Sequence, residues 1–366
     1  MSEIKNKIIT ISGEPVSGKS TVVKTLKEKY ESMGYNVHVI STGYVFREVI
    51  MQEYLRMYPD RKNANLADVQ ADEAFAHKRN EIDKLVDEEM RKKGIEINSQ
   101  ERPNDVYIID SRLAWHNIPA SYAIRLTVDE KIAGERAFKD KTRGPEDRYK
   151  TVEEAIQKTR ERKLGEIKRY KEKYGIDLSD PQNYDLIVDT AYSNTDELAD
   201  IIIAGEESYR KGIKYPKNWA SPVHFISMQK IKDCDSKERK KKFEMIKQGK
   251  YNLIEEPLYV AENNGVKILL DGNHRCHAGL MAGKTLFPYI ITHKDDEIAK
   301  QREQELYEDP TLESTYDWAE AIEYYGGSIG QIERLKGFKV TDLLSLIKST
   351  FLRKKMRLDQ QGEDGR

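Results

Sequence analysis

The sequence predicts an α/β protein: a parallel sheet with flanking helices, followed by a smaller α+β unit. Over roughly the first 208 residues, short apolar runs alternate with long charged segments of helical character. After a polar stretch at 209–222 the pattern changes to closely spaced strands. The chain has 366 residues, which is more than one compact core of ordinary size holds. We therefore expect two domains, at 1–208 and 209–294, and a C-terminal helical region with a disordered tail at 295–366.

The elements of the first domain follow from its apolar runs. The β-branched run at 7–11 predicts a buried strand, followed by a glycine-containing loop and a helix that ends near Gly34. An amphipathic helix at 196–204 closes the domain. Strands that alternate with helices indicate a parallel sheet. Further strands are expected at 35–40, 106–109, 124–128 and 185–188.

The second domain contains shorter elements. Its very basic segment at 237–248 predicts a helix, and the glycine turn at Asp271–Gly272 leads into another helix. From residue 295 onward the pattern indicates helices interrupted at Asp309–Pro310 and Gly326–Gly327. Strands are expected at 223–226, 257–260, 266–270 and 287–292.

The charge balance and the cysteine content exclude several classes of protein. The 62 Lys and Arg residues nearly cancel the 63 Asp and Glu residues, which argues against a general nucleic-acid-binding protein. Cys234 and Cys276 are too few for a disulfide framework or a structural zinc site of their own. No apolar run reaches the length of a membrane span, and the start shows no hydrophobic signal region. We therefore expect a cytoplasmic protein without a membrane partner.

A phosphate-binding motif lies between the first strand and the first helix. Gly13 to Ser20, GEPVSGKS, fits the P-loop pattern G-x-x-x-x-G-K-[ST] in the structural context that the pattern requires. The loop amides and the positive end of the helix would surround the phosphates of ATP, with Lys19 beside the β- and γ-phosphates. Ser20 would hold Mg²⁺, and Asp110 would either share that role or cap a loop. The expected ATP-binding residues are Gly13, Ser17, Gly18, Lys19, Ser20 and Thr21.

Arginines after neighbouring strands suggest a site for a phosphorylated acceptor. Arg47 follows the second strand and Arg112 follows the third. Because the loops after parallel strands meet at one edge of the sheet, both side chains can converge on an acceptor that faces the P-loop. Further arginines lie in the helical stretch before the fifth strand, where a hinged lid could close over the substrates or where they form ordinary surface pairs. They are Arg136, Arg143, Arg148, Arg160, Arg162 and Arg169.

The first 205 or so residues resemble the archaeal-type cytidylate kinases, a branch of the nucleoside monophosphate kinases. The resemblance rests on an ordered set of segments: SGEPVSGKST, STGYVFRE, EIDKLVDEE, DSRLAW and RYKEKYGIDLSDPQNYDLIVDT. Glu14 and Val16 depart from the small, proline or glycine residues more often found there, and segments 58–71 and 95–105 are insertions. The insertions either widen the acceptor pocket or are tolerated surface loops.

The resemblance implies a reaction and roles for particular residues. The activity would be ATP- and Mg²⁺-dependent phosphoryl transfer to a nucleoside monophosphate, with CMP or dCMP as acceptor. Lys19, Arg112 and the lid arginines Arg162 and Arg169 would be catalytic. The acceptor phosphate or base would be bound by Arg47, Arg112 and the paired acidic residues Asp83 and Asp87.

A second motif follows the predicted strand at 266–270. The turn Asp271-Gly-Asn-His-Arg275 precedes a helix with small residues and presents backbone donors and a guanidinium at one place, an arrangement suited to phosphate. The segment resembles the ParB/sulfiredoxin fold, most closely the free serine kinases. By that resemblance Asn273, His274 and Arg275 would bind a second nucleotide or a small phosphorylated ligand, with Glu255 and Glu256 as candidate acids.

Blander interpretations and other functions stay open. His274 and Arg275 could cap the helix, and Cys276 is expected to be a small buried packing residue. The chain could instead phosphorylate another small hydroxyl or a nucleic-acid end. It could also be a nucleotide-controlled binding switch that reports to a partner, with stoichiometric nucleotide binding and negligible turnover.

Overall fold

The computed structural model describes residues 6–61, 64, 69, 72, 75, 79–140, 149–222, 225–227, 237–263 and 266–294. The chain divides into two compact units. The first comprises Met1–Val188 and Ala199–Lys214, and the second comprises Asp189–Leu198 and Tyr215–Arg366. The domain limits expected at 208 and 294 remain predictions, and the expected C-terminal helices at 295–366 lie outside the described residues.

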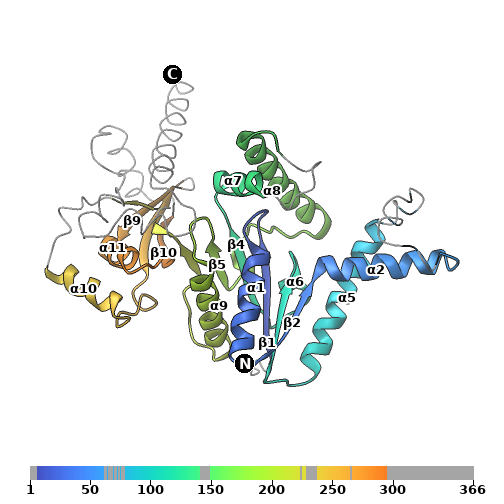
Figure 1. The fold of residues 1–366 in the computed structure, drawn as a ribbon, viewed down its shortest axis with the longest axis horizontal. Helices are drawn as coiled ribbons and strands as arrows, with labels where there is room; N and C mark the ends of the chain where they lie inside the picture. Colours follow the sequence, from blue (N-terminus) through green and yellow to red (C-terminus); the bar gives the residue numbers. More distant parts are fainter. Residues whose placement is uncertain are drawn as a thin grey trace. The chain divides into compact units, whose positions relative to one another are not determined.

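The first unit is an α/β fold whose described elements alternate along the chain (Figure 1). Its strands are β1 (Lys7–Gly13), β2 (Asn36–Ser41), β3 (Asp105–Asp110), β4 (Tyr122–Thr127) and β5 (Leu186–Asp189). Its helices are α1 (Lys19–Ser32), α2 (Thr42–Met57), α5 (Arg79–Ser99), α6 (Ala114–Asn117), α7 (Glu130–Lys139), α8 (Val152–Tyr174), the short 3₁₀ helix η2 (Pro181–Asn183) and, from Ala199 onward, α9 (Thr195–Arg210).

The sheet of this unit has the strand order β2-β3-β1-β4-β5. Strand β1 pairs in parallel with both β3 and β4, and β2 pairs in parallel with β3. Every residue of β1 is buried, as expected for a strand covered on both faces, whereas β2 at the edge is largely exposed. The predicted parallel α/β sheet is confirmed.

The register brings several strand ends to one edge of the sheet. Asp110 at the end of β3 is opposite Ile11 of β1 and Ser41 of β2, and Gly13 is opposite Leu126 of β4. The loop after β1, the start of α2 and the turn after β3 therefore begin at neighbouring positions. This edge is where ligands bind in open parallel sheets.

Helices α2 and α5 pack together beside β3 and share one hydrophobic cluster. Val45, Val49 and Tyr54 of α2 meet Ile82 and other apolar residues of α5. The buried positions are 45, 49, 50 and 54 on α2 and 82, 86, 90 and 97 on α5, so most recur four residues apart and each helix buries one stripe. The cluster fixes the segment that follows β2, and with it the expected acceptor side of the site.

Helices α7 and α8 lie side by side beyond β4 (Figure 1). They approach closely at Gly134, where an added Cβ would lie 2.3 Å from Ile156 Cγ1 and 2.6 Å from Ile156 Cα. No side chain fits between the two backbones at that point. Thr151 caps α8 by accepting from the Glu154 amide at 3.1 Å, and Gly175 ends the helix in the left-handed conformation with φ of 68°.

The second unit combines a mixed sheet with two described helices of its own. Its strands are β6 (Asn218–Ala220), β7 (Phe225–Ser227), β8 (Leu258–Asn263), β9 (Val266–Asp271) and β10 (Phe287–Lys294), and its helices are α10 (Lys237–Lys247) and α11 (Asn273–Met281). The strands of this sheet are arranged in the order β6-β10-β8-β9-β7. Pairs β8–β9 and β6–β10 are antiparallel, and β8–β10 and β7–β9 are parallel. The sequence did not predict β6, a three-residue strand inside a polar stretch.

Among the described helices, none combines the length and the apolar character that crossing a lipid bilayer requires.

Candidate phosphate-transfer site

The loop between β1 and α1 has the backbone of a tight anion-binding turn. Gly18 adopts a left-handed conformation with φ of 78°, and an added Cβ there would meet no atom within 4 Å. Val16 has φ of 62°, a conformation that β-branched residues rarely adopt. The Glu14 amide donates to the Leu126 carbonyl at 2.9 Å, which anchors the loop to the end of β4. The loop therefore opens onto the start of α1, where backbone N–H groups lack partners within the helix.

Lys19, the first residue of α1, forms an ion pair with Asp110 at the end of β3. The two side chains are 21% and 19% exposed. Burial, together with the nearby Arg112 guanidinium, lowers the pKa of Lys19 to about 8, and the Glu166 carboxylate opposes this shift. Lys19 and Arg112 thus lie close enough for their charges to interact.

Arg112 is held by a carboxylate from α8, the helix that carries the expected lid arginines Arg162 and Arg169. Its Nε donates to Glu166 Oε2 at 2.9 Å, and its Nη2 donates to Glu166 Oε1 at 3.3 Å. Arg162, one turn earlier on α8, donates from Nε to Glu166 Oε1 at 3.3 Å. A forked pair of this kind presents two oxygens to a guanidinium, as a phosphate does. The Glu166 carboxylate therefore marks a position where two arginines hold an anion.

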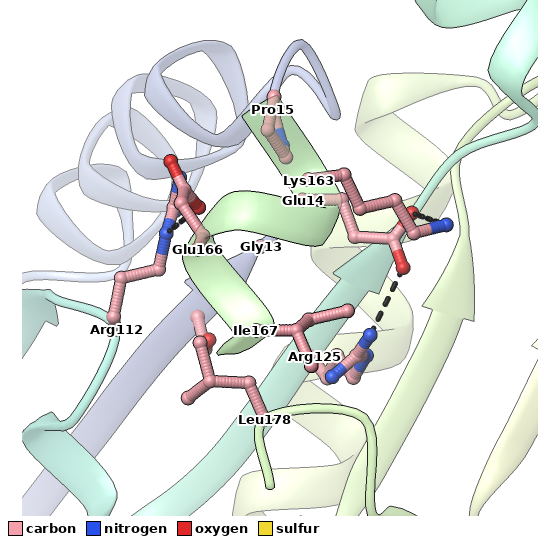
Figure 2. Close-up of a pocket in the computed structure, with 10 residues that line it drawn as sticks. Gly13, Glu14, Pro15, Arg112, Arg125, Lys163, Glu166, Ile167 and Leu178 are labelled. Carbon is pink, nitrogen blue, oxygen red and sulfur yellow. Dashed lines mark hydrogen bonds and ion pairs between the residues drawn. The ribbon is translucent and has the colours of Figure 1, made fainter. Parts of the chain in front are cut away.

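A pocket lies between the P-loop and α8 (Figure 2). Gly13, Glu14 and Pro15 form its P-loop side, and Lys163 and Glu166 contribute from α8. Its remaining lining residues are Ser12, Arg112, Arg125, Ile167 and Leu178. The predicted acceptor arginine Arg112 and the P-loop therefore share one cavity within the first unit.

Two other expected substrate-binding residues, Arg47 and Asp87, are not among the described residues that line this pocket. Arg47 lies in the second turn of α2 and is exposed, and an added Cβ on Gly43 would be 3.9 Å from its Nη1. The guanidinium therefore points back along the helix toward the sheet edge. Asp87 on α5 accepts from Tyr174 Oη at 2.8 Å and from Asn117 Nδ2 at 3.3 Å. Asp83 belongs to the same helix, one turn earlier.

The two expected lid arginines occupy different surroundings on α8. Arg162 contacts the Glu166 carboxylate, so it joins the arrangement around Arg112. Arg169 is exposed, and its Cζ lies 5.1 Å from the centre of the Tyr170 ring. Tyr170 in turn stacks on Tyr174. Arg143 and Arg148 lie outside the described residues.

The residues at the start of α1 suit a magnesium ion bound together with nucleotide phosphates. Ser20 is exposed in the first turn of α1, and the Asp110 carboxylate lies beside Lys19. Within the described part of the chain, no group of three or more His, Cys, Asp or Glu residues is placed to hold a metal. A dedicated cage is not needed, because Mg²⁺ usually takes one or two protein oxygens and completes its shell with phosphates and water. The donor set is therefore compatible with Mg²⁺.

In the second motif, Arg275 is bound to the backbone of a neighbouring segment. That side chain is 5% exposed, and its Nη1 donates to the backbone carbonyls of Glu256 at 2.7 Å and Pro257 at 2.9 Å. The guanidinium binds the carbonyls of the chain entering β8, and a contact between Arg275 and a phosphate remains a prediction. His274 lies in the first turn of α11 beside it, Asn273 begins that helix, and Cys276 is buried. The ParB/sulfiredoxin-like identity of this unit remains a prediction.

Replacing Arg275 by alanine is expected to lower the free energy of unfolding by about 2 to 4 kcal/mol, because the Glu256 and Pro257 carbonyls lose the donor that this buried side chain supplies. Urea unfolding of the full chain, followed by circular dichroism, measures the change. The exposed Lys250→Ala in the same unit is the matched control and should leave the curve unchanged. Unaltered unfolding of the Arg275 variant would show that the guanidinium does not support the fold.

These features define the first unit as a P-loop kinase domain. A family model described as an AAA domain matches residues 12–157. The chain is 30% identical over 204 residues to the cytidylate kinase of Methanocella arvoryzae, covering 56% of this chain and 99% of that protein. The cytidylate kinase of Methanocaldococcus jannaschii is also 30% identical, over 209 residues, 56% of this chain and 99% of that protein. Over about half its length, the chain belongs to the cytidylate kinase family.

A longer relative has a different name. The S-adenosylmethionine-dependent nucleotide dehydratase of Lacinutrix mariniflava is 29% identical over 206 residues, 56% of this chain. The chain spans only 36% of that protein's length. The matches to the two cytidylate kinases, over 204 and 209 residues, are comparable in length to the first unit.

Four charged residues of the pocket were not predicted as site residues: Glu14, Arg125, Lys163 and Glu166. Glu14 had stood out only as a departure from the usual P-loop composition. Glu166 and Ile167 lie three and four residues after Lys163 on α8, so the three side chains share one face of the helix. That spacing was the available signal, but the sequence does not say which face of a highly charged helix turns toward the P-loop.

Proposed function

We propose that the first unit transfers the γ-phosphoryl group of MgATP to CMP or dCMP. The observation that carries the proposal is the convergence of the P-loop, Lys19 and Arg112 at one edge of the sheet, with Arg112 and residues 13–15 lining a single pocket. Phosphoryl transfer requires cations on both sides of the transferred group, because negative charge spreads over it in the transition state. The cytidylate kinase relatives support the choice of acceptor.

The chain's own residues divide between donor and acceptor. The loop amides and Lys19 would hold the β- and γ-phosphates, and Ser20 and Asp110 would supply oxygens to Mg²⁺. A magnesium ion bound there would neutralise charge on the donor phosphates. Lys19 and Asp110 form an ion pair, so Lys19 would turn from this carboxylate toward the phosphates when the donor binds.

Arg112 would bind the acceptor phosphate. Its Nε and Nη2 donate to the Glu166 carboxylate, so the acceptor phosphate would have to displace that carboxylate. Arg47, which points toward the same edge, and Asp87, fixed by Tyr174 and Asn117, would contribute from the acceptor side. Carboxylates accept hydrogen bonds from the exocyclic amine of cytosine, which suits Asp83 or Asp87 to base recognition.

An acceptor screen tests this proposal. Purified full-length protein with MgATP is given CMP, dCMP, UMP, AMP, free serine or an oligonucleotide 5′ end, and ADP release is followed in a coupled assay. CMP and dCMP are expected to give the highest kcat/KM. Preferential turnover of serine or of the oligonucleotide would overturn the assignment, and stoichiometric ATP binding without turnover of any acceptor would favour a binding switch.

A further inference from the structure

Glu14 places a nearly buried carboxylate inside the P-loop. Its side chain is 8% exposed, and it accepts three contacts from two other parts of the first unit. Arg125 Nη2 on β4 donates to Oε1 at 2.9 Å, and the Val128 amide donates to Oε2 at 3.3 Å. Lys163 Nζ on α8 lies 3.0 Å from Oε2. Glu14 therefore joins the phosphate loop, the end of β4 and the lid helix.

A lone carboxylate at this position would oppose the binding of a triphosphate, because it adds a negative charge beside the phosphate loop. Arg125 and Lys163 reverse this effect, because the group formed by Glu14 and these two cations carries a net charge of about +1. The Arg125 side chain is 9% exposed and comes from a central strand of the sheet. Lys163 comes from α8 and is 26% exposed, so it is the more accessible of the two cations.

The ammonium group of Lys163 has three N–H donors, and contact with Glu14 uses one of them. Its side chain lines the same pocket as Gly13, Glu14 and Pro15 (Figure 2). Arg162, the residue before it, and Arg169 are exposed on α8 instead. The lid residue that reaches the P-loop itself is thus a lysine that the family resemblance did not point to.

We propose that Lys163 is a further cation for the donor phosphates and that Glu14 is the residue that positions it. Glu14 keeps the ammonium over the loop, where its remaining donors are available to a phosphate oxygen. The inference rests on the proposed function, since it takes the P-loop to be the MgATP site. It adds a lid contact to the donor, whereas Arg112 and Glu166 concern the acceptor.

A double-mutant cycle measured with MgATP alone tests the proposal by calorimetry on the full chain. Lys163→Met is expected to weaken MgATP binding about tenfold, the size of one lost charge-assisted hydrogen bond. Glu14→Asp, which keeps the charge but shortens the side chain, should weaken it less, by about threefold, and the double variant should match Lys163→Met because Glu14 acts through Lys163. Lys163→Arg, which keeps the charge, should recover most of the affinity.

Lys168→Met is the matched control, because Lys168 is an exposed lysine of the same helix paired with Glu172. It should leave MgATP affinity unchanged. Wild-type affinity in Lys163→Met would overturn the role of Lys163, and additive effects of the two substitutions would overturn positioning by Glu14. Because no acceptor is present, failure of CMP as a substrate does not affect this test. If the unsubstituted protein fails to bind MgATP, the donor site of the proposed function is itself wrong.

Discussion

Lys19→Ala is expected to lower the rate of CMP phosphorylation by about three orders of magnitude. The substitution removes the cation that the proposed function places beside the β- and γ-phosphates, and it leaves Asp110 without its ion-pair partner at the end of β3. An unneutralised carboxylate would then face the donor phosphates, so both effects act in the same direction. Steady-state CDP formation with saturating MgATP and CMP measures the loss.

Lys24→Ala is the matched control for this experiment. Lys24 is on the same helix, its side chain is 77% exposed, and it pairs with Glu28 across one turn. Its removal should change neither the rate nor the unfolding curve. Lys19→Ala should also leave the second unit folded, because Lys19 belongs to the first. If Lys19→Ala retains CMP phosphorylation near the wild-type rate, the P-loop is not the donor site.

Arg112→Ala is expected to raise the KM for CMP by about 10- to 100-fold and to lower kcat, with the affinity for MgATP nearly unchanged. The reason is that the guanidinium can hold two oxygens of one anion, as it holds both oxygens of Glu166. Arg112→Lys keeps the charge but loses the fork, so an intermediate KM is expected. Initial rates over a matrix of ATP and CMP concentrations separate the two substrates.

Arg160→Ala serves as the control for Arg112→Ala, since Arg160 is 59% exposed on α8 and pairs with Glu130 of α7. It should alter neither KM. The opposite pattern for Arg112→Ala, with ATP binding lost and the KM for CMP retained, would move Arg112 to the donor side.

The fold of the first unit could be predicted well because its signals are local. The run KIITI and the glycine pattern that follows it specify β1, the loop and the start of α1 within 14 residues of sequence, from Lys7 to Ser20. The position of Arg112 also follows from a local fact, because it comes directly after a parallel strand, and Arg47 is expected near the same sheet edge because its helix follows β2. Neither inference depends on how distant segments of the chain pack together.

The remainder of the site depends on tertiary packing. Helix α8 carries charge on several faces, and only its placement beside the P-loop selects Lys163 and Glu166 over exposed residues such as Arg169. Arg275 shows a second limit of sequence reasoning: a guanidinium bonds carbonyl oxygens and phosphate oxygens with the same donors. The sequence places Arg275 in a glycine turn, but burial decides that its partners are the carbonyls of Glu256 and Pro257.

A crystal structure with a non-hydrolysable ATP analogue, Mg²⁺ and CMP would show whether the P-loop and Arg112 hold the two nucleotides of the transfer reaction. We expect triphosphate density on residues 13–21 and the CMP phosphate on Arg112, with the contact between Arg112 and Glu166 broken. An intact pair of Arg112 and Glu166 beside a filled P-loop, with CMP absent or bound elsewhere, would contradict it.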